Sequence, residues 1–316
     1  MVMKELLVKG LVIGGNGFIG SHLVDVLLRA GHKVRVFDRS PELFRPPLPE
    51  VEYRLHHFDD SAAMAEALEG VDVVFHLLST SVPSTSNLDP VADIQSNLVG
   101  TVKLLQLMQQ KGITKIVYLS SGGTVYGIPE TVPILERHPL QPICSYGVVK
   151  VAIENYLLMF QRLYGLRPVI LRPSNPYGEL QGHGGVQGVI GTFLRKVEAS
   201  EKIEIWGDGA IVRDFIHVSD MAELCLKVVE QDACGIFNAG SGEGHSILEI
   251  LGAVERVTGK KIAPVFKPPR NFDVPKVILD VTHATKVFAW QPRVDLDEGV
   301  ARTWRWMCGA AFNKTN

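Results

Sequence analysis

Residues 11–31 read LVIGGNGFIGSHLVDVLLRAG, a short apolar run that leads through a glycine-rich turn into an amphipathic pattern. The apolar run predicts a buried strand at Leu11–Ile13, and the following pattern predicts a helix at Gly20–Ala30. Glycines in the turn permit a sharp reversal and a close approach of the backbone to another group. They are Gly14, Gly15, Gly17 and Gly20. A strand joined to a helix in this way is the first unit of a parallel, helix-covered sheet.

Short β-rich runs continue to alternate with helical patterns through the first half of the chain. The further predicted strands are Lys33–Phe37, Val51–Leu55, Val71–Leu77, Ile116–Ser120 and Pro168–Arg172. The predicted helices between them are Ala62–Leu68, Ala92–Lys111 and Tyr146–Leu163. This alternation predicts an α/β fold built on a doubly wound parallel sheet of the Rossmann type, with strands buried on both faces.

The alternation ends after Arg172. Residues 173–188 read PSNPYGELQGHGGVQG, which is typical of a long loop, and a predicted helix, Val189–Ala199, and strand, Ile203–Trp206, follow. We therefore expect residues 1–175 to form the sheet domain, with segments around 210–240 returning to it. Residues 176–316 are expected to form mainly a smaller C-terminal α/β lobe over the carboxyl edge of the sheet, where such folds bind ligands.

The composition limits the class of protein. The chain has 316 residues, 46% of them hydrophobic, and a net charge of −2. These values are typical of globular enzymes, and no basic run suggests nucleic acid as a partner. The four cysteines show neither CxxC spacing nor a metal pattern, which indicates free thiols in a reducing cytoplasm and no metal site. The start of the chain is interpreted as a first strand, not a signal peptide, and no run approaches the roughly 20 apolar residues of a membrane helix.

The glycine turn and the end of the second predicted strand indicate a dinucleotide. The start of the helix after the turn presents free backbone amides to a pyrophosphate. Asp38 ends the second strand in VRVFDRS, residues 34–40, where a carboxylate accepts hydrogen bonds from the adenosine ribose. The same carboxylate would repel a 2′-phosphate, so NAD is favoured over NADP, although Arg39 is near enough in sequence to hold that phosphate. The alternative interpretation is a glycine-rich turn that binds nothing.

The segment SYGVVK, residues 145–150, carries a phenol and an amine four positions apart. On a helix this spacing places Tyr146 and Lys150 on one face. An ammonium near the phenol, together with the positive charge of the nicotinamide, favours the phenolate, so Tyr146 is suited to act as a general base. The alternative is an exposed pair on a helix. The position after SSGGTVYG, residues 120–127, at the start of a long amphipathic helix favours the catalytic interpretation.

The chain resembles an extended short-chain dehydrogenase/reductase of the nucleotide-sugar epimerase/dehydratase family. The resemblance runs nearly end to end and looks closest to UDP-sugar 4-epimerases, such as those acting on UDP-glucose or UDP-N-acetylglucosamine. The motifs that carry it are GGNGFIG, HLLSTSVPSTS, NLVGT, SSGGTVYG, SYGVVK, RPSNPYG, IWGDGAIVRDFIHVSD and RNFDVPKVILD.

The resemblance implies roles for further residues. It assigns NAD to Gly14, Gly17, Phe18, Ile19, Gly20, Asp38, Arg39, Leu77, Ser79, Asn97, Tyr146, Lys150, Pro173 and Ser174. It assigns the nucleotide sugar to Asn175, Trp206, Arg213, Arg270 and Val277. In this scheme Trp206 lines the uracil, the two arginines bind the diphosphate, and Val277 is a small gate that leaves room for an N-acetyl group. The alternatives are a core tryptophan, surface ion pairs, and a valine that selects nothing.

One departure from the family concerns the adenine. Family members usually have Gly-Asp after the third strand, and the aspartate holds the adenine amino group. Here the segment reads LHHFDD, residues 55–60, with His57 at that place. Either His57 makes a different contact with the adenine, or Asp59 substitutes for the missing carboxylate.

The implied reaction is epimerisation at C4 of a UDP-hexose through a transient 4-keto sugar, with NAD as a recycled hydride carrier. Dehydratases of the family carry an Asp-Glu pair where this chain has Gly123 and Thr124, which argues against dehydration. A nucleotide-sugar 4-keto reductase and a non-catalytic NAD-binding scaffold are the alternatives. The family usually dimerises through two long helices, for which residues 92–111 and 146–163 are the candidates.

The motif SSGGTVYG has glycine where a hydroxyl is expected. Alignment on TVYG puts Gly122 at the position of the catalytic Ser or Thr of the family. In an extended segment Thr124 would share a face with Gly122, so its hydroxyl is the preferred replacement. Ser121 is the second candidate, and a bound water in the vacated volume is the third.

Overall fold

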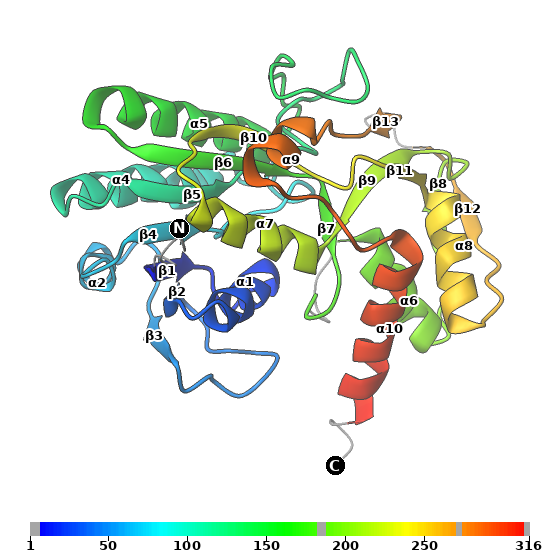
Figure 1. Ribbon diagram of the computed structural model, residues 1–316. Coiled ribbons are helices and arrows are strands. Elements are labelled where there is room, and N and C mark those ends of the chain that lie inside the picture. Colours follow the sequence, from blue (N-terminus) through cyan, green and yellow to red (C-terminus); the bar gives the residue numbers. More distant parts are fainter. Residues whose placement is uncertain (1–6, 182–187, 270–273, 313–316) are drawn as a thin grey trace.

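The computed structural model describes residues 7–181, 188–269 and 274–312. At its centre lies a seven-stranded sheet with the strand order β10-β6-β5-β4-β1-β2-β3 (Figure 1). Its strands are β1 (Lys9–Ile13), β2 (Lys33–Asp38), β3 (Val51–Leu55), β4 (Val73–His76), β5 (Lys115–Leu119), β6 (Arg167–Pro173) and β10 (Gly235–Ala239). All neighbouring strands pair in parallel. The predicted doubly wound α/β fold is therefore confirmed, with element ends shifted by one or two residues.

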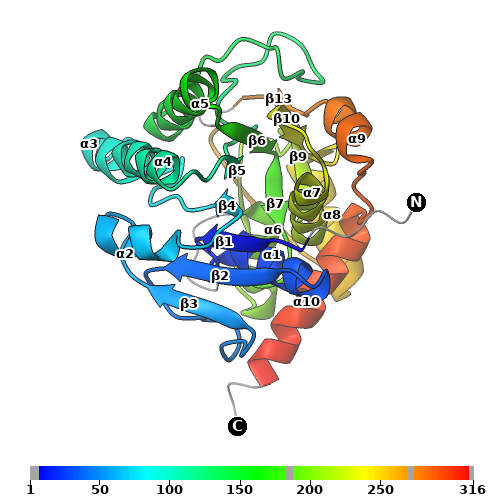
Figure 2. The same cartoon turned by 60° about the vertical axis from the view of Figure 1, so that its left-hand side comes forward.

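Helices cover both faces of this sheet (Figure 2). One face carries α1 (Phe18–Arg29) and α7 (Val218–Glu230), and the other carries α2 (Ser61–Ala67), α4 (Gly100–Gln110) and α5 (Ser145–Tyr164). Alternate residues of β1 enter different cores: Val12 packs on the α1 side, whereas Leu11 and Ile13 pack on the α4 and α5 side. Burial on both faces explains why the strands read as continuous apolar runs.

The predicted helix at 92–111 is not one regular helix. It consists of α3 (Pro90–Asp93), a π-helical segment η1 (Ile94–Val99) and α4. Within this segment the Asn97 Nδ2 donates to Oδ1 of Asp93 at 2.8 Å, and the Asn97 Oδ1 accepts from the Thr80 amide at 2.9 Å. π-Helical turns occur frequently at functional sites, and these buried polar contacts lie beside the candidate site.

The C-terminal part contains two smaller sheets. In one, β7 (Asn175–Tyr177), β11 (Gly244–Ser246) and β13 (Lys276–Val277) pair with β9 (Val212–His217); in the other, β8 (Glu204–Trp206) pairs with β12 (Val265–Lys267). Its helices are α6 (Val189–Glu198), α8 (Ile247–Thr258) and α10 (Leu296–Phe312), whereas α9 (Thr282–Phe288) packs against β10 and α7 of the large sheet. The helices α6, α8 and α10 lie side by side (Figure 1), and a separate apolar core joins them.

The chain crosses between the two parts more than once. After β9 and α7, strand β10 pairs with β6 at the edge of the large sheet. The domain boundary at 175/176 stays a prediction. Among the described residues, no helix has both the length and the apolar character needed to cross a membrane.

Candidate active site

The turn after β1 forms a cradle that only glycine fits. Gly14 has a φ of +83°, which favours glycine, and its carbonyl accepts from the Gly17 amide at 3.2 Å. A Cβ at Gly20 would overlap the Gly14 carbonyl oxygen. The α1 helix begins at Phe18, so its free backbone amides lie directly after this turn. This arrangement fits a pyrophosphate at the helix N-terminus.

A cavity of about 410 Å³ lies beside the ends of β2 and β3. Asp38, Arg39, His57, Asp59 and Ser79 are among the residues that line it. The Asp38 carboxylate accepts from the backbone amides of Asn16 and Ser40, each at 3.1 Å, which fixes its orientation. The cavity fits an adenosine. His57 and Asp59, the two alternatives for the contact with the adenine, both line it.

A second cavity, of about 500 Å³, brings together most residues that the sequence assigned to chemistry and to the nicotinamide end of the cofactor. These residues are Phe18, Ile19, Leu77, Ser79, Ser121, Thr124, Tyr146, Lys150, Pro173, Ser174 and Asn175. They come from α1, the segment after β4, the segment after β5, α5, and the end of β6 with the start of β7. Asn97 lies beside this group rather than in the cavity and holds Thr80.

Tyr146 and Lys150 lie one helical turn apart near the start of α5. The Lys150 ammonium lies 5.4 Å from the centroid of the Tyr146 ring and donates to the Leu119 carbonyl at 2.7 Å. Burial lowers the pKa of Lys150 to about 7, although the charges of Glu154 and Asp93 raise it. Burial raises the pKa of Tyr146 to about 12, against the lowering effect of a hydrogen bond with Ser79. Without a bound cation, the phenol is therefore protonated at neutral pH.

The SSGGTVYG segment is not extended, as the sequence prediction assumed. The amides of Thr124 and Val125 both donate to the Ser121 carbonyl, which closes a turn. Gly122 leaves no open volume, because a Cβ there would meet the Leu279 side chain at 2.6 Å and the Arg172 carbonyl at 2.9 Å. The premise that Thr124 fills a space left by Gly122 is therefore wrong. A Cβ at Gly123, in contrast, would meet nothing within 4 Å.

Both candidate hydroxyls of this segment nevertheless lie at the cavity. Ser121 and Thr124 line it. The Thr124 Oγ1 is buried and has no hydrogen-bond partner among the described residues. Ser120 does not offer its hydroxyl proton to a ligand, because this hydroxyl donates to Oε1 of Glu154 at 2.5 Å. The geometry leaves Thr124 and Ser121 as the hydroxyls available to a ligand.

Behind the cavity lies a buried ion pair that sequence reasoning missed. The Arg172 guanidinium on β6 donates to both carboxylate oxygens of Glu154 on α5, at 3.0 and 2.6 Å. It also donates to the Tyr126 hydroxyl at 2.9 Å, and Tyr126 in turn donates to Asn238. The available signal was an arginine within the apolar strand VILRP. The network fixes α5 and the SSGGTVYG turn against the sheet.

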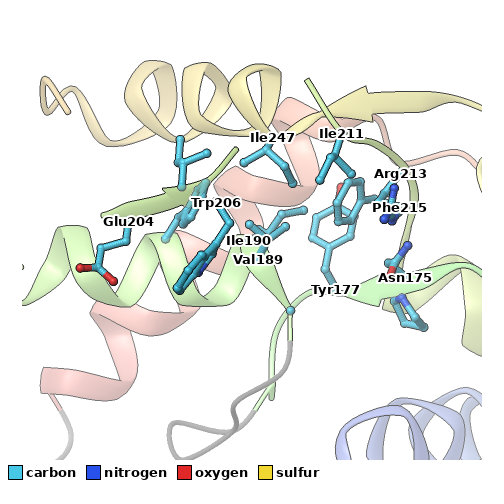
Figure 3. A pocket seen from close by; sticks show the side chains of 14 residues that line it. Asn175, Tyr177, Val189, Ile190, Glu204, Trp206, Ile211, Arg213, Phe215 and Ile247 are labelled. Atoms are coloured by element: carbon cyan, nitrogen blue, oxygen red, sulfur yellow. The ribbon is translucent and has the colours of Figure 1, made fainter. Parts of the chain in front are cut away.

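A third cavity, of about 300 Å³, opens between β7, α6, β8 and β9 (Figure 3). Tyr177, Ile190, Trp206, Phe215 and Ile247 make it largely apolar, and Asn175 and Arg213 lie together at one end. Trp206 is 42% exposed, so it is not a core residue. An aromatic pocket with an arginine at one end fits a nucleobase attached to phosphates.

One assigned substrate residue, Val277, does not line this pocket. Val277 is 4% exposed, and it packs in a small cluster with Val125, Tyr126 and Leu279. It lines none of the cavities described above, so the geometry gives no support to a gate at this position. Arg270 lies outside the described residues.

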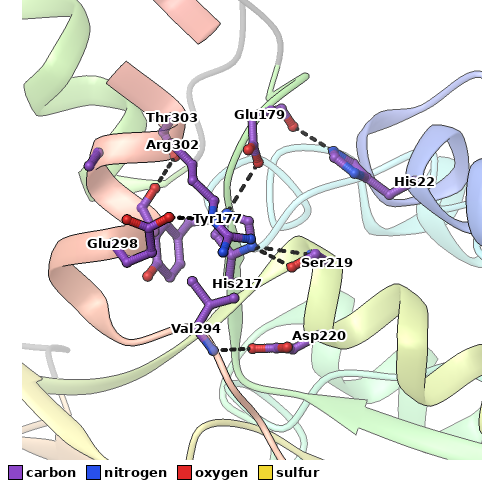
Figure 4. Close-up of polar contacts among 12 residues, drawn as sticks. His22, Tyr177, Glu179, His217, Ser219, Asp220, Val294, Glu298, Arg302 and Thr303 are labelled. Atoms are coloured by element: carbon purple, nitrogen blue, oxygen red, sulfur yellow. Dashed lines mark hydrogen bonds and ion pairs between the residues drawn. The ribbon is translucent and has the colours of Figure 1, made fainter. Parts of the chain in front are cut away.

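Sequence reasoning also missed a polar junction between the two parts of the chain (Figure 4). The buried His217 has its Nδ1 2.8 Å from the Ser219 hydroxyl and its Nε2 3.1 Å from Oε2 of Glu179. The Glu179 carbonyl lies 2.9 Å from Nε2 of His22 on α1. These contacts attach the segment after β7 to α1 and α7. They thereby hold the cavity residues Asn175 and Pro176 against the cofactor side.

Comparison with known proteins identifies the family. The model of the NAD dependent epimerase/dehydratase family matches residues 10–240. The chain belongs to this family. It is 36% identical to a UDP-glucose 4-epimerase of Mycolicibacterium smegmatis, over 93% of this chain and 97% of the relative. It is also 33% identical to a dTDP-4-dehydro-6-deoxyglucose reductase of Escherichia coli, over 92% and 94% of the two chains.

A solved structure extends the comparison. The UDP-glucose 4-epimerase of Thermotoga maritima, solved with UDP-glucose, superposes with a TM-score of 0.90 at 34% identity, over 97% of this chain and 99% of that one. The resemblance inferred from the motifs, at the level of the family and of UDP-sugar 4-epimerases, is thus confirmed.

Proposed function

We propose that this family member is an NAD-dependent UDP-sugar 4-epimerase that interconverts UDP-hexoses at C4. One observation carries the proposal: the aromatic pocket and the cavity of Tyr146 share Asn175, Pro176 and Gly188 on their walls. A nucleotide held in the pocket therefore directs its sugar towards Tyr146. Relatives named as UDP-glucose 4-epimerases support this assignment.

The residues described above fit NAD, and different groups of them would bind different parts of it. The glycine cradle at Gly14–Gly20 would hold the pyrophosphate, Asp38 the adenosine ribose, and Ser79, Pro173 and Ser174 the nicotinamide end. When bound, NAD would supply the redox chemistry, as the acceptor and donor of the hydride at C4 of the hexose. Its positive ring charge favours the phenolate of the nearby Tyr146, because an opposite charge stabilises the ionised form.

The chain itself supplies proton transfer and positioning. Tyr146 takes the proton of the sugar 4-OH as C4 is oxidised and gives it back when C4 is reduced. Lys150 stabilises the phenolate electrostatically. Thr124, or Ser121 in its place, orients the sugar oxygen. Trp206 contacts the uracil, and Arg213 contacts the diphosphate, with Arg270 as the second proposed arginine.

A reductase acting on a nucleotide 4-keto sugar is the second candidate, because one relative carries that name. It needs the same Tyr146 and Lys150 but consumes reduced cofactor in each turnover. An epimerase regenerates its cofactor and needs only a catalytic amount. Oxidation of NADH or NADPH by a dTDP-4-keto sugar in stoichiometric amount would favour the reductase.

We also propose a homodimer in the cytoplasm. Exposed apolar side chains lie along two neighbouring helical segments. One segment consists of α3, η1 and α4, and the other is α5. They are Val91, Ile94, Val99, Val148, Tyr156, Met159 and Leu163. Two copies of this face would bury one another in a four-helix arrangement. Light scattering should give twice the mass of the chain, and Met159→Glu combined with Leu163→Glu should give monomers.

The decisive test is incubation with NAD and a panel of UDP-, GDP- and dTDP-hexoses, including UDP-N-acetylhexosamines. The products are resolved by configuration at C4. We expect epimers from UDP-hexoses and none from the Tyr146→Phe variant. If the protein binds NAD but produces no epimer from any UDP-sugar, the epimerase is excluded and the non-catalytic NAD-binding scaffold is supported.

A further inference from the structure

Asp93 is a buried carboxylate at the end of α3 and is 3% exposed. Three side chains donate to it. The hydroxyl of Ser81 and Nδ2 of Asn97 donate to Oδ1, at 2.7 and 2.8 Å. The hydroxyl of Ser145 donates to Oδ2 at 2.8 Å. Both carboxylate oxygens are therefore engaged.

All three donors are neutral. Within the described residues, Asp93 forms no ion pair. Its burial contrasts with that of Glu154, whose carboxylate is matched by the Arg172 guanidinium. A buried charge that only neutral groups contact directly is costly, so such groups concentrate at functional sites.

The donors come from three segments that surround the candidate catalytic pair. Ser145 directly precedes Tyr146 at the start of α5. Ser81 lies in the segment after β4, and its carbonyl accepts from the Ser79 hydroxyl at 3.1 Å. Asn97 lies in η1 and also holds Thr80. Asp93 thus joins the segment of Ser79 to the segment of Tyr146, and both Ser79 and Tyr146 line the same cavity.

We propose that Asp93 is a positioning residue for the reaction at Tyr146. Its hydrogen bonds hold the start of α5 against the segment of Ser79, and its negative charge acts on both Tyr146 and Lys150. The catalytic part of this inference rests on the proposed epimerase. The electrostatic part concerns only this chain and can be tested without substrate.

The sign of the electrostatic effect follows from the surrounding charges. The groups facing Tyr146 and Lys150 are Glu154 on α5, Cys144 before it, Tyr118 on β5, His76 on β4, and Asp93. After burial, which lowers the pKa of Lys150 and raises that of Tyr146, the charge of Asp93 raises both pKa values. Removing that charge must therefore lower both, so the whole pH–rate profile moves in one direction.

The test uses Asp93→Asn, which keeps the size of the side chain and removes its charge. We expect the pH dependence of kcat to move to lower pH by about one unit, the scale of one partly screened charge. The matched control is Asp89→Asn. Asp89 is exposed and caps α3 through the Ala92 amide, a role that asparagine also performs, so its profile should stay in place. A lower kcat with an unmoved profile for Asp93→Asn would leave only a structural role and overturn the inference.

A second readout needs no turnover. NMR of protein labelled at lysine Cε reports the titration of Lys150, whose signal is assigned by its loss in Lys150→Met. We expect its midpoint near pH 7 in the wild type and below that in Asp93→Asn. An unchanged midpoint overturns the electrostatic role even if no UDP-hexose is epimerised. Conversely, a shifted midpoint without epimerisation leaves the charge assignment standing and removes only the proposed activity.

The hydrogen-bonding role has its own variant. Ser145→Ala removes one donor to Asp93 but keeps its charge, and it is a mild change should Asp93→Asn fail to fold. We expect kcat to fall about tenfold, the scale of one lost charge-assisted hydrogen bond, with KM and the Lys150 midpoint nearly unchanged. A kcat equal to that of the wild type would show that this contact does not position Tyr146.

Discussion

The Lys150 ammonium lies 5.4 Å from the centroid of the Tyr146 ring, while its short hydrogen bond goes to the Leu119 carbonyl at 2.7 Å. Lys150 is thus fixed by the backbone of β5, and we expect its charge to act on the phenol through space. Both side chains are buried, so their electrostatic interaction is weakly screened by water. We therefore expect the positive charge of Lys150 to matter more for the reaction than a particular donor geometry.

Replacing Lys150 by methionine should lower kcat by a factor on the order of 10² to 10⁴, the range of general acid–base catalysis. Loss of the ammonium raises the pKa of Tyr146, so the remaining activity should increase as the pH is raised. Lys150→Arg, which keeps the charge, should retain more activity than the methionine variant. Steady-state rates between pH 6 and 10 test this. Equal loss in both variants would argue against a through-space charge effect.

Thr124→Val should separate activity from stability. The Thr124 Oγ1 is buried without a partner in the described part of the chain, and an unsatisfied buried hydroxyl costs about 1–3 kcal/mol. Its removal should raise the free energy of unfolding by about 1 kcal/mol. If this hydroxyl orients the sugar oxygen, kcat should nevertheless fall about tenfold, with little loss of NAD binding. Urea unfolding, turnover and NAD titration measure the three quantities.

The comparison variant is Ser121→Ala, which removes the other hydroxyl on the cavity wall. It should leave turnover close to that of the wild type. A Thr124→Val enzyme that turns over at the wild-type rate, together with a slow Ser121→Ala enzyme, would transfer the role to Ser121. Full activity in both would point to a bound water.

The fold was predictable because its signals are local. Leu11–Ile13, the glycine turn and the helix after it fix one βα unit, and the repeated alternation fixes a parallel sheet. The π-helical segment η1 was not predictable. The apolar periodicity of residues 92–111 is that of a regular helix, and the contacts of Asn97 with Asp93 and Thr80 form only when the chain folds.

The candidate site also has features that the sequence predicts and features that it does not. The positions of Tyr146 and Lys150 follow from helical spacing, and both line one cavity. The Arg172–Glu154 pair spans two elements, and so does the attachment of Glu179 to His22 and His217. Such contacts have no sequence spacing of their own. The error at Gly122 arose because an extended backbone was assumed where the chain turns.

A serine at position 122 should therefore destabilise the protein and should not increase its activity. In Gly122→Ser the new Cβ would meet the Leu279 side chain and two backbone carbonyl oxygens of β6, and the backbone oxygens cannot move aside easily. Overpacking of this kind costs about 1–3 kcal/mol, and turnover should not rise. Gly123→Ser is the matched control, because its Cβ meets open space and should be tolerated. Chemical unfolding and epimerisation rates test both. A stable, faster Gly122→Ser enzyme would contradict the geometry.

His76 should make the protein sensitive to acid. Its ring is 2% exposed, and Nε2 lies 2.8 Å from the Thr101 hydroxyl. Burial, and then the charge of Lys150, lowers the pKa of His76 from 6.5 to about 3. Above pH 6.5 the ring is neutral in both the folded and unfolded states and contributes no pH dependence. Below pH 6.5 only the unfolded chain takes up this proton, so the free energy of unfolding should fall by about 1.4 kcal/mol per pH unit.

Urea unfolding at pH 7 and pH 5 should therefore show a loss of about 2 kcal/mol from this group. His76→Gln should lack that component, whereas His57→Gln, at an exposed position, should keep it. An equal decline in all three proteins would mean that His76 is protonated in the folded state.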